Sequence, residues 1–552
     1  MSQLARRALR RLSRLFSSYG SGMGAQKVEL LAQLERAVLG KAEVRRLHEI
    51  LCFLRAYPDD RALLAEVERM LDAFERRRDL QRHRDGLANS GIAGTALRFR
   101  FFAATARRLA RRWPEQLSID WDNWDDAARL LRVLPLVALP AERAAFDEPS
   151  LEPRSWLQRY AGGDAAFLLR GWGAFEADDL VRDAFYDDLD PPLMLEPGPG
   201  TPCRTREKYD KLPVVYQTAP LSRTRPDLQR EVERGPLSVR DVSAREADAL
   251  IELARNCMLP RERDLEVFAY ANRDDVRLVD CGAGVWFACI GVVPERRSLL
   301  EAVYAFLMLK NGVAVGYALC SALFASSEVA FNLFETFRGG ETAILFGRVL
   351  AMVRALFGSD AFAIDPYQLG HGNDEGLASG AFWFYQKLGF RPRKREVART
   401  MQRELARMRV RPAHRSSLAT LKVLASAPVF WGLRERDDVM GLLSMSNVAL
   451  HVSRYVCDRF GADRELARET CMCEGAARLG VAPRRLAELR MWERWAPLVA
   501  SIPGVERWTR PQKRALVELI RAKGDTRESD FVPLFEKHRR LRTAVERLAR
   551  GN

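Results

Sequence analysis

The sequence lacks the features that mark the special classes of protein. It contains no low-complexity tract and nothing typical of a collagen, a coiled coil or a disordered chain. With 47% apolar and 29% charged residues, the composition is that of a globular protein. A chain of 552 residues is too long for one ordinary core, and it predicts roughly three or four folded units.

Long apolar runs are also missing. The longest candidate, residues 311–327, is uncharged but shorter than the about 20 residues that a bilayer-crossing helix needs, and it contains glycines and serines typical of strands and turns. No continuous apolar segment follows the N-terminal arginines, which argues against a secretory signal. We therefore expect no transmembrane segment.

Cysteines are present without the spacing of a metal site or a disulfide framework. The nine cysteines are odd in number, irregularly spaced and include no CxxC pair. They indicate buried thiols in a reducing compartment, and we expect a cytoplasmic protein without a bound metal. The nearest approach to a metal cluster in the sequence is formed by His451, Cys457, Cys471 and Cys473.

Acidic residues are absent before Glu29, while leucines alternate with arginines up to about residue 16. This pattern predicts a basic amphipathic helix. Three interpretations stay open: a first helix docked on the protein, which we favour; a helix making surface contact with a membrane through residues 1–16; or an organelle transit peptide.

The net charge of +15 comes from arginines that are scattered among acidic residues. Interleaved charges of both signs are typical of solvated helix faces and argue against nucleic-acid binding.

Four segments differ in their patterns. Residues 1–135 have helical periodicity, as in Leu63, Leu64, Val67, Met70, Leu71 and Phe74, which share one helix face. Residues 136–235 are richer in proline and glycine and predict an irregular connector, with a tight turn at 198–202. Residues 236–395 predict an α/β domain, and residues 400–552 a basic helical region.

Within 236–395, the sequence predicts a strand at 237–242, a helix at 244–255, and strands at 303–309 and 313–321 joined by an Asn311-Gly312 turn. A strand at 329–334, a helix at 342–357, a strand at 361–364 and a helix at 374–388 follow.

Three stretches in this element order resemble the GNAT N-acyltransferase superfamily. They are 237–242 with its helix, the glycine turn Phe337-Arg338-Gly339-Gly340-Glu341-Thr342-Ala343, and the stretch 381–390 that ends in Tyr385-Gln386-Lys387-Leu388-Gly389-Phe390. The resemblance implies a GNAT-like mixed sheet with helices on both faces, flanked by mainly α-helical N- and C-terminal regions.

A glycine turn entering a helix leaves backbone N–H groups free at the positive end of the helix dipole, which suits a pyrophosphate. The resemblance implies that acetyl-CoA or another acyl-CoA is held by Arg338, Gly339, Gly340, Thr342 and Ala343. It also implies that strand amides near Asn332 and Leu333 polarise the thioester carbonyl.

Two positions depart from the family pattern. Glu341 stands where the family has a glycine, and its carboxylate is expected to compete with phosphate for the helix amides. Ala378 stands where an asparagine is usual, seven residues before Tyr385, and Asn373 lies too early to replace it.

Three residues are candidates for proton transfer. Tyr385 matches the family tyrosine that protonates the departing thiolate, although it is equally well interpreted as a core aromatic. Glu328 and Glu335, at the two ends of the strand before the glycine turn, are candidate bases, and either is also compatible with a solvated strand-end charge.

We therefore predict an acyl-CoA-dependent N-acyltransferase that acts on an unknown amine. Two alternatives stay open: a non-catalytic GNAT-like binding or scaffolding module, which Glu341 and Ala378 favour, and a transferase that uses aminoacyl-tRNA as donor, for which positive charge would be useful.

Overall fold

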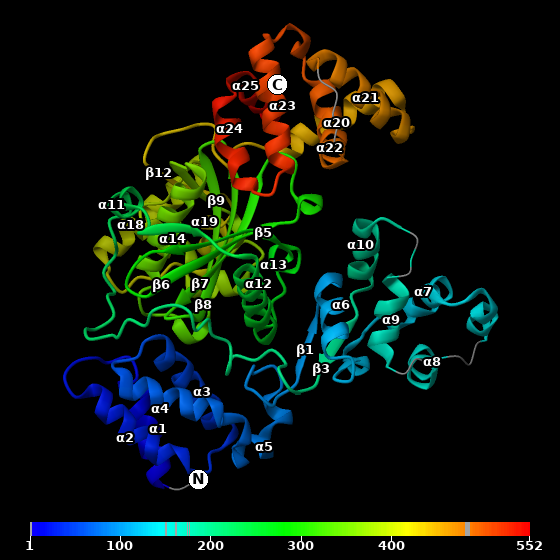
Figure 1. Cartoon of the computed structure of the whole chain (residues 1–552). Coiled ribbons are helices and arrows are strands. Elements are labelled where there is room, and N and C mark those ends of the chain that lie inside the picture. Colours follow the sequence, from blue (N-terminus) through cyan, green and yellow to red (C-terminus); the bar gives the residue numbers. More distant parts are fainter. Residues whose placement is uncertain are drawn as a thin grey trace.

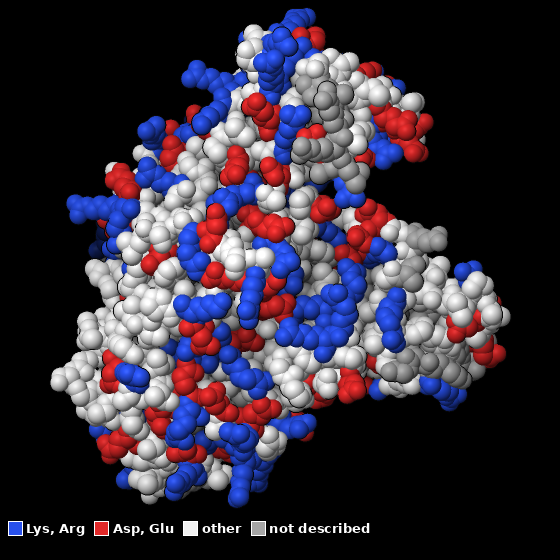
Figure 2. Space-filling view, viewed as in Figure 1, with Lys and Arg blue, Asp and Glu red and all other residues white. Residues whose placement is uncertain are grey.

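The computed structural model describes residues 3–551 except 149–151, 161–162, 174, 176 and 481–485. Figure 1 shows the N-terminal helices and the C-terminal helices at opposite ends of a central sheet, with a smaller unit projecting to one side. Lysine and arginine are interleaved with aspartate and glutamate over the viewed face (Figure 2), as the sequence indicates.

The first unit is a helical bundle with its own apolar core. Its helices are α1 (Gln3–Leu15), α2 (Met23–Glu35), α3 (Lys41–Ala56), α4 (Arg61–Asp72) and α5 (Arg78–His83). The Asp60 carboxylate caps α4 by accepting a hydrogen bond from the Leu63 amide. The apolar face predicted for this stretch is confirmed, since Val67, Met70 and Leu71 are buried.

Helix α1 is docked on this bundle. Ala5, Ala8, Leu9 and Leu12 are buried in the bundle core, whereas Arg7 and Arg11 are exposed. Because the apolar face is already covered, insertion into a membrane surface would require α1 to leave the bundle. No helix in the described ranges is both long and apolar enough to span a bilayer.

Residues 97–195 form a second unit with a separate core. Three antiparallel strands in the order β1-β3-β2 pack with five helices. The strands are β1 (Leu97–Arg100), β2 (Leu117–Ile119) and β3 (Pro192–Leu195), and the helices are α6 (Ala103–Arg112), α7 (Leu130–Val137), α8 (Pro153–Tyr160), α9 (Asp164–Gly173) and α10 (Asp179–Leu189). The core therefore runs across the boundary that the sequence suggested near residue 135.

The irregular connector begins only after β3. The predicted tight turn is present, because the Thr201 amide and hydroxyl both donate to the Gly198 carbonyl and Gly200 has φ +71°. The chain then crosses the sheet at the hairpin 311–312 and ends in α11 (Leu228–Arg234), which packs against the central helix α14 (Thr342–Phe357).

The central sheet has nine strands in the order β11-β12-β10-β9-β8-β7-β6-β5-β4. Neighbours are antiparallel except β9 and β10, which are parallel and joined through α14. The strands are β4 (Ser238–Asp241), β5 (Ala271–Asp280), β6 (Val285–Val292), β7 (Ala302–Lys310), β8 (Val313–Leu323), β9 (Ser326–Leu333), β10 (Ala361–Ile364), β11 (Arg391–Pro392) and β12 (Val429–Gly432).

Several predicted elements are confirmed. Asn311 and Gly312 both have positive φ in the β7–β8 turn. Helix α12 (Ala244–Met258) begins at its Ser243 cap, and α14 has the predicted bounds. The predicted helix 374–388 is instead divided into α16 (Asp374–Ser379) and α17 (Ala381–Lys387), because Gly380 adopts φ +66°.

The C-terminal region is helical apart from β12, and its core is continuous with that of the sheet. Its helices are α18 (Arg395–Val410), α19 (Leu418–Leu424), α20 (Met445–Phe460), α21 (Arg464–Leu479), α22 (Leu486–Ser501), α23 (Arg510–Gly524), α24 (Phe531–Lys537) and α25 (Arg539–Ala549). β12 inserts between β10 and β11, so the sheet extends beyond the predicted domain end at 395. The fold is thus a mixed α/β structure, with a large mixed sheet and flanking helices.

Candidate functional site

Strands β9 and β10 pair along only part of their length. Within the described chain, β10 pairs with Ser326, Ser327 and Glu328 of β9, and residues 329–333 continue without a partner on that side. A strand edge without a partner exposes backbone N–H and C=O groups that a ligand can bind. The open edge leads directly into the glycine turn and α14.

The direction of the β9 amides follows from its pairing with β8. The Phe334 amide donates to the Val315 carbonyl, and Asn332 is paired with Tyr317 in the same ladder. Since amides alternate in direction along a strand, the Asn332 amide faces β8 and the Leu333 amide faces the open edge. Of the two predicted polarising amides, Leu333 has its N–H on the side that is free.

The glycine turn leaves the start of α14 available to an anion. Gly339 has φ +87° and open space where a Cβ would stand. Among the described residues, the amides of Thr342, Ala343 and Ile344 have no hydrogen-bond acceptor, whereas the Leu345 amide donates to the Glu341 carbonyl. Free amides at a helix N-terminus favour a bound negative charge.

Glu341 does not occupy these amides. It is the N-cap residue of α14, but its side chain accepts no capping hydrogen bond. Its carboxylate lies 3.6 Å from Nζ of Lys310, which is only 2% exposed. Glu341 is therefore the counter-charge of a buried lysine. Its carboxylate leaves the helix amides free for a phosphate, contrary to the competition expected from the sequence.

Arg338 lies at the open edge of β9, where other protein groups engage it. Its Nε donates to the Leu333 carbonyl at 3.0 Å, and its Nη2 lies 2.6 Å from the Glu375 carboxylate. Gly340 is approached by the connector, since a Cβ there would lie 3.1 Å from Leu221. Gly339, Thr342 and Ala343 are thus the predicted lining residues that are least occupied by other contacts.

Glu328 is the predicted base with the more unusual environment. It is partly buried on β9, opposite Ala363 of β10 and Ser321 of β8. Burial raises the pKa of Glu328 to about 7, with further contributions from the nearby carboxylates of Asp365 and Glu301. A carboxyl group that titrates near neutral pH is suited to accept a proton.

Tyr385 lies in an aromatic cluster. Its ring centroid is 5.4 Å from that of Phe346 and 5.1 Å from that of Phe384, and Phe331 of β9 lies 5.3 Å from Phe346. Burial raises the pKa of the Tyr385 phenol well above its usual range. No described residue hydrogen-bonds its hydroxyl, so both interpretations of Tyr385, as an acid and as a core aromatic, remain.

Ala378 lies in α16, before the break at Gly380, and Asn373 is the N-cap residue of this helix. Asn373 caps this helix by accepting a hydrogen bond from the Gly376 amide and donating one to the Tyr367 carbonyl. Its amide group is therefore engaged in local structure and does not replace the family asparagine.

Glu335 is exposed at the far end of β9, between two cavities of about 490 Å³ and 240 Å³ that it lines together with Arg338. The smaller cavity is also bordered by Asn332. Its five arginines are Arg45, Arg204, Arg261, Arg263 and Arg338. Three carboxylates, Glu262, Glu335 and Glu375, border the same space, which leaves an excess of positive charge.

Two of these arginines are fixed by neighbouring groups. Arg204 lies 2.7 Å from Glu49 and donates to the Thr336 hydroxyl at 2.6 Å, and Arg261 stacks 3.8 Å above the Phe334 ring. The Nε atoms of Arg204 and Arg261 are buried without a partner among the described residues. The cavity therefore has a positively charged wall whose arginines are held in place by the protein.

Sequence reasoning missed this cavity because its arginines come from α3, the connector, the segment after α12 and the glycine turn. No local motif signals them. The described residues include no group of His, Cys, Asp and Glu that could hold a metal, and all nine cysteines are free thiols, seven of them buried.

No model of a known protein family, no curated protein and no solved structure matches the chain.

Proposed function

We propose that this protein is an acyl-CoA-dependent N-acyltransferase, which transfers an acyl group, most simply acetyl, to an amine by direct attack. The observation that carries the proposal is the partial pairing of β9 with β10, which opens an unpaired backbone edge directly before the free amides of α14. The sequence resemblance to GNAT acyltransferases supports the same site.

The two faces of β9 offer different chemistry. Phe331 points towards α14 and the aromatic cluster that contains Tyr385. Glu328 and Asn332, at alternate positions, point to the opposite face. An amine near Glu328 and a leaving group near Tyr385 would then approach the thioester carbonyl from the two faces of β9.

A bound acyl-CoA would supply a thioester carbonyl as the acceptor of the amine. In the proposal, Glu328 takes the proton from the attacking amine, directly or through a water. The Leu333 amide donates a hydrogen bond to the carbonyl oxygen, on which negative charge increases during attack. Tyr385 gives its proton to the departing sulfur.

Binding is tested by heating the protein with and without acetyl-CoA. At a hundredfold excess over the dissociation constant, a ligand of the folded state stabilises it by about 2.7 kcal/mol. Ala343→Asp places a carboxylate in the first turn of α14, where it stabilises the helix but repels phosphate, so it should weaken binding at least about tenfold without loss of fold.

Ala244→Asp is the matched control, because it makes the same change in the first turn of α12. It should leave acetyl-CoA binding unchanged. Absence of any thermal shift in the wild type, or equal binding by Ala343→Asp, would contradict the proposal.

Turnover is tested by release of the free thiol of CoA with a panel of amines. Since Glu328 must be deprotonated to act as a base and has a pKa of about 7, the rate should rise with pH up to about 7 and then level off. Glu328→Gln should lower the rate by about 10²–10⁴-fold, while Glu396→Gln, an exposed carboxylate on α18, should not.

A second candidate, a non-catalytic binding module, is favoured by the contacts that hold the glycine turn. Thr336 is hydrogen-bonded to Arg204, and Phe337 stacks on Phe53 of the N-terminal bundle. Acetyl-CoA binding without thiol release for any amine would support this module. The aminoacyl-tRNA alternative is favoured by the arginine-lined cavity, because arginines can bind the phosphates of tRNA. A gel shift with aminoacylated tRNA at low salt tests this alternative.

A further inference from the structure

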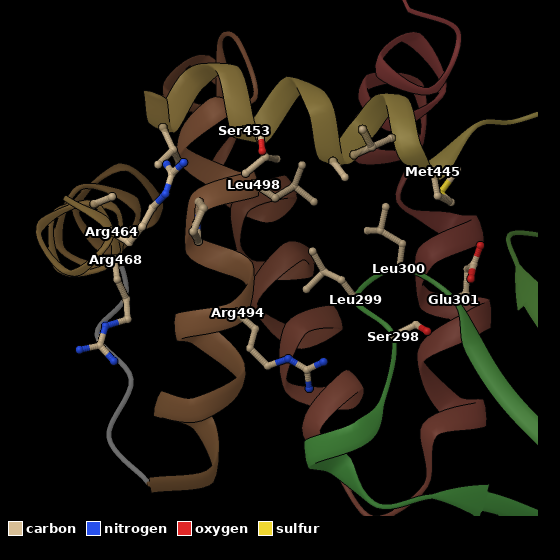
Figure 3. A pocket seen from close by; sticks show the side chains of 16 residues that line it. Ser298, Leu299, Leu300, Glu301, Met445, Ser453, Arg464, Arg468, Arg494 and Leu498 are labelled. Carbon is tan, nitrogen blue, oxygen red and sulfur yellow. The ribbon is translucent and has the colours of Figure 1, made fainter. Parts of the chain in front are cut away.

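A third cavity, of about 510 Å³, lies far from the glycine turn, where the C-terminal helices meet the loop before β7 (Figure 3). Its size falls within the range of about 300–1,000 Å³ that is usual for small-molecule sites. Most of its wall is apolar. The lining side chains come from the loop 298–301 and from α20, α21 and α22.

Helix α20 turns one whole face to this cavity. Met445, Val448, Ala449, Val452 and Val456 follow helical spacing, and all five line the space. Ala449 is exposed, and Met445 and Val452 are only partly covered. An apolar helix face that its own protein leaves open favours an apolar ligand.

Leu299 and Leu300 approach from the opposite side of the cavity, and Leu498 of α22 projects into it (Figure 3). The loop that carries the two leucines is held in place by Arg494, whose guanidinium donates to the carbonyls of Pro294 and Arg297. The apolar walls are therefore fixed before any ligand arrives.

One end of the cavity is positively charged. Arg464 and Arg468 lie one turn apart on α21 at this end, and their side chains extend in opposite directions (Figure 3). Arg468 pairs with Glu493 at 2.8 Å. Arg464 contacts Cys457 Sγ at 3.3 Å, and no described carboxylate lies within ion-pair distance of it. An exposed guanidinium without a counter-charge is available for an anion.

We propose that this cavity binds a single-chain amphiphile, with an aliphatic chain against α20 and an anionic head group, a carboxylate or a phosphate, at Arg464. The combination of a long apolar wall with arginines at one end matches both parts of such a molecule. The site is separate from the glycine turn, so the proposal does not depend on the acyltransferase activity.

Calorimetry of the full chain with decanoate, decyl phosphate, decanol and decyltrimethylammonium, below their micelle-forming concentrations, tests the chemistry. We expect the two anions to bind more tightly than the alcohol and the cation to bind most weakly. The stronger of the two anions identifies the head group. Each methylene added between octanoate and dodecanoate should tighten binding about fourfold.

Two pairs of variants test where the amphiphile binds. Ala449→Trp fills the cavity at an exposed position and should abolish binding, whereas Leu450→Trp, on the same helix but outside the cavity, should not. Arg464→Gln should reduce the preference for the anions over the alcohol, and Arg454→Gln, an exposed arginine of α20 outside the lining, should preserve it.

Equal binding of cation and anion, or binding by Ala449→Trp as tight as that of the wild type, would overturn the proposal. A dimer in analytical ultracentrifugation that Ala449→Trp dissociates would also overturn it, because a second copy of the chain would then be the occupant of the cavity.

Discussion

The two junctions between the sheet and its helical regions are built differently. At the N-terminal junction, α3 meets the glycine turn through Phe53, Glu49 and Arg204, and two cavities remain between the surfaces. At the C-terminal junction, Lys523 and Glu528 form a fully buried ion pair at 2.5 Å, and Phe324 of the sheet packs on Phe535.

The C-terminal contacts extend into the sheet itself. Arg297 donates to the Lys523 carbonyl, and Asp275 of β5 accepts hydrogen bonds from the Glu528 amide and the Tyr304 hydroxyl. This network is satisfied almost entirely by protein groups. Around this network the C-terminal junction is closed by paired buried charges, and its one described cavity lies to the side and is lined mainly by apolar groups. The cavities of the N-terminal junction are instead lined by charged groups beside the glycine turn.

The largest loss of stability is expected at the C-terminal junction, called the closed junction below. Lys523→Met leaves the buried Glu528 carboxylate with Arg297, 3.9 Å away, as its remaining cation. Breaking a buried pair from one side typically costs about 3–5 kcal/mol. Urea unfolding should show a loss of this size. Lys513→Met, on the same helix but outside the network, is the control. A loss of less than about 1 kcal/mol would mean that the network does not hold the C-terminal helices in place.

A smaller loss of stability is expected at the N-terminal junction, called the open junction below. Burial opposes ionisation of Glu49, but Arg204 beside it lowers the pKa of Glu49 to about 2. Because the pKa is lower in the folded state, the pair stabilises the fold above about pH 4.5, and this contribution is lost as the pH falls towards 2.

At pH 7, Glu49→Gln should therefore reduce stability by about 2 kcal/mol in urea unfolding. Glu43→Gln, in the first turn of the same helix, should have a smaller effect. If Glu49→Gln were as damaging as Lys523→Met, the two junctions would not differ in the proposed way.

The smallest change in stability is expected at Glu328. Removing its charge should stabilise the protein, by an amount that depends on pH. The pKa of Glu328 is raised to about 7 in the folded protein, so the folded state binds more protons than the unfolded state between about pH 4.5 and 7. Stability from this group is present below about pH 4.5 and is lost as the pH rises through 7.

Glu328→Gln should therefore match the wild type at low pH and exceed its stability by about 1–2 kcal/mol at pH 8. Thermal unfolding over this pH range measures the difference. A variant that is less stable than the wild type at pH 8 would show that the Glu328 carboxylate is stabilised as an anion, contrary to the environment described.

The sequence predicted elements whose signals are local. The apolar spacing of Leu345, Val349 and Val353 was sufficient for α14, and Asn311-Gly312 was sufficient for the β7–β8 turn. β5 could not be found in this way, because Asp275 and Arg277 interrupt its apolar pattern. Those charges are buried through partners more than 200 residues further along the chain, such as Ser529.

The candidate site was predictable to a similar extent. The glycine turn, Tyr385 and Glu328 were identified from short motifs and positions at strand ends. The role of Glu341 could not be predicted, since its counter-charge Lys310 lies at the end of β7, far from Glu341 in the sequence. β12 was missed because it has four residues and finds its neighbours only in the folded sheet.

Hydrogen–deuterium exchange with and without saturating acetyl-CoA tests the central claim most directly. If the open edge of β9 and the start of α14 hold the ligand, exchange should slow in peptides covering 329–345 and stay unchanged in peptides covering 520–531. Unchanged exchange in 329–345 for the wild type, or equal slowing in Ala343→Asp, would contradict the assignment of acyl-CoA binding to this end of the sheet.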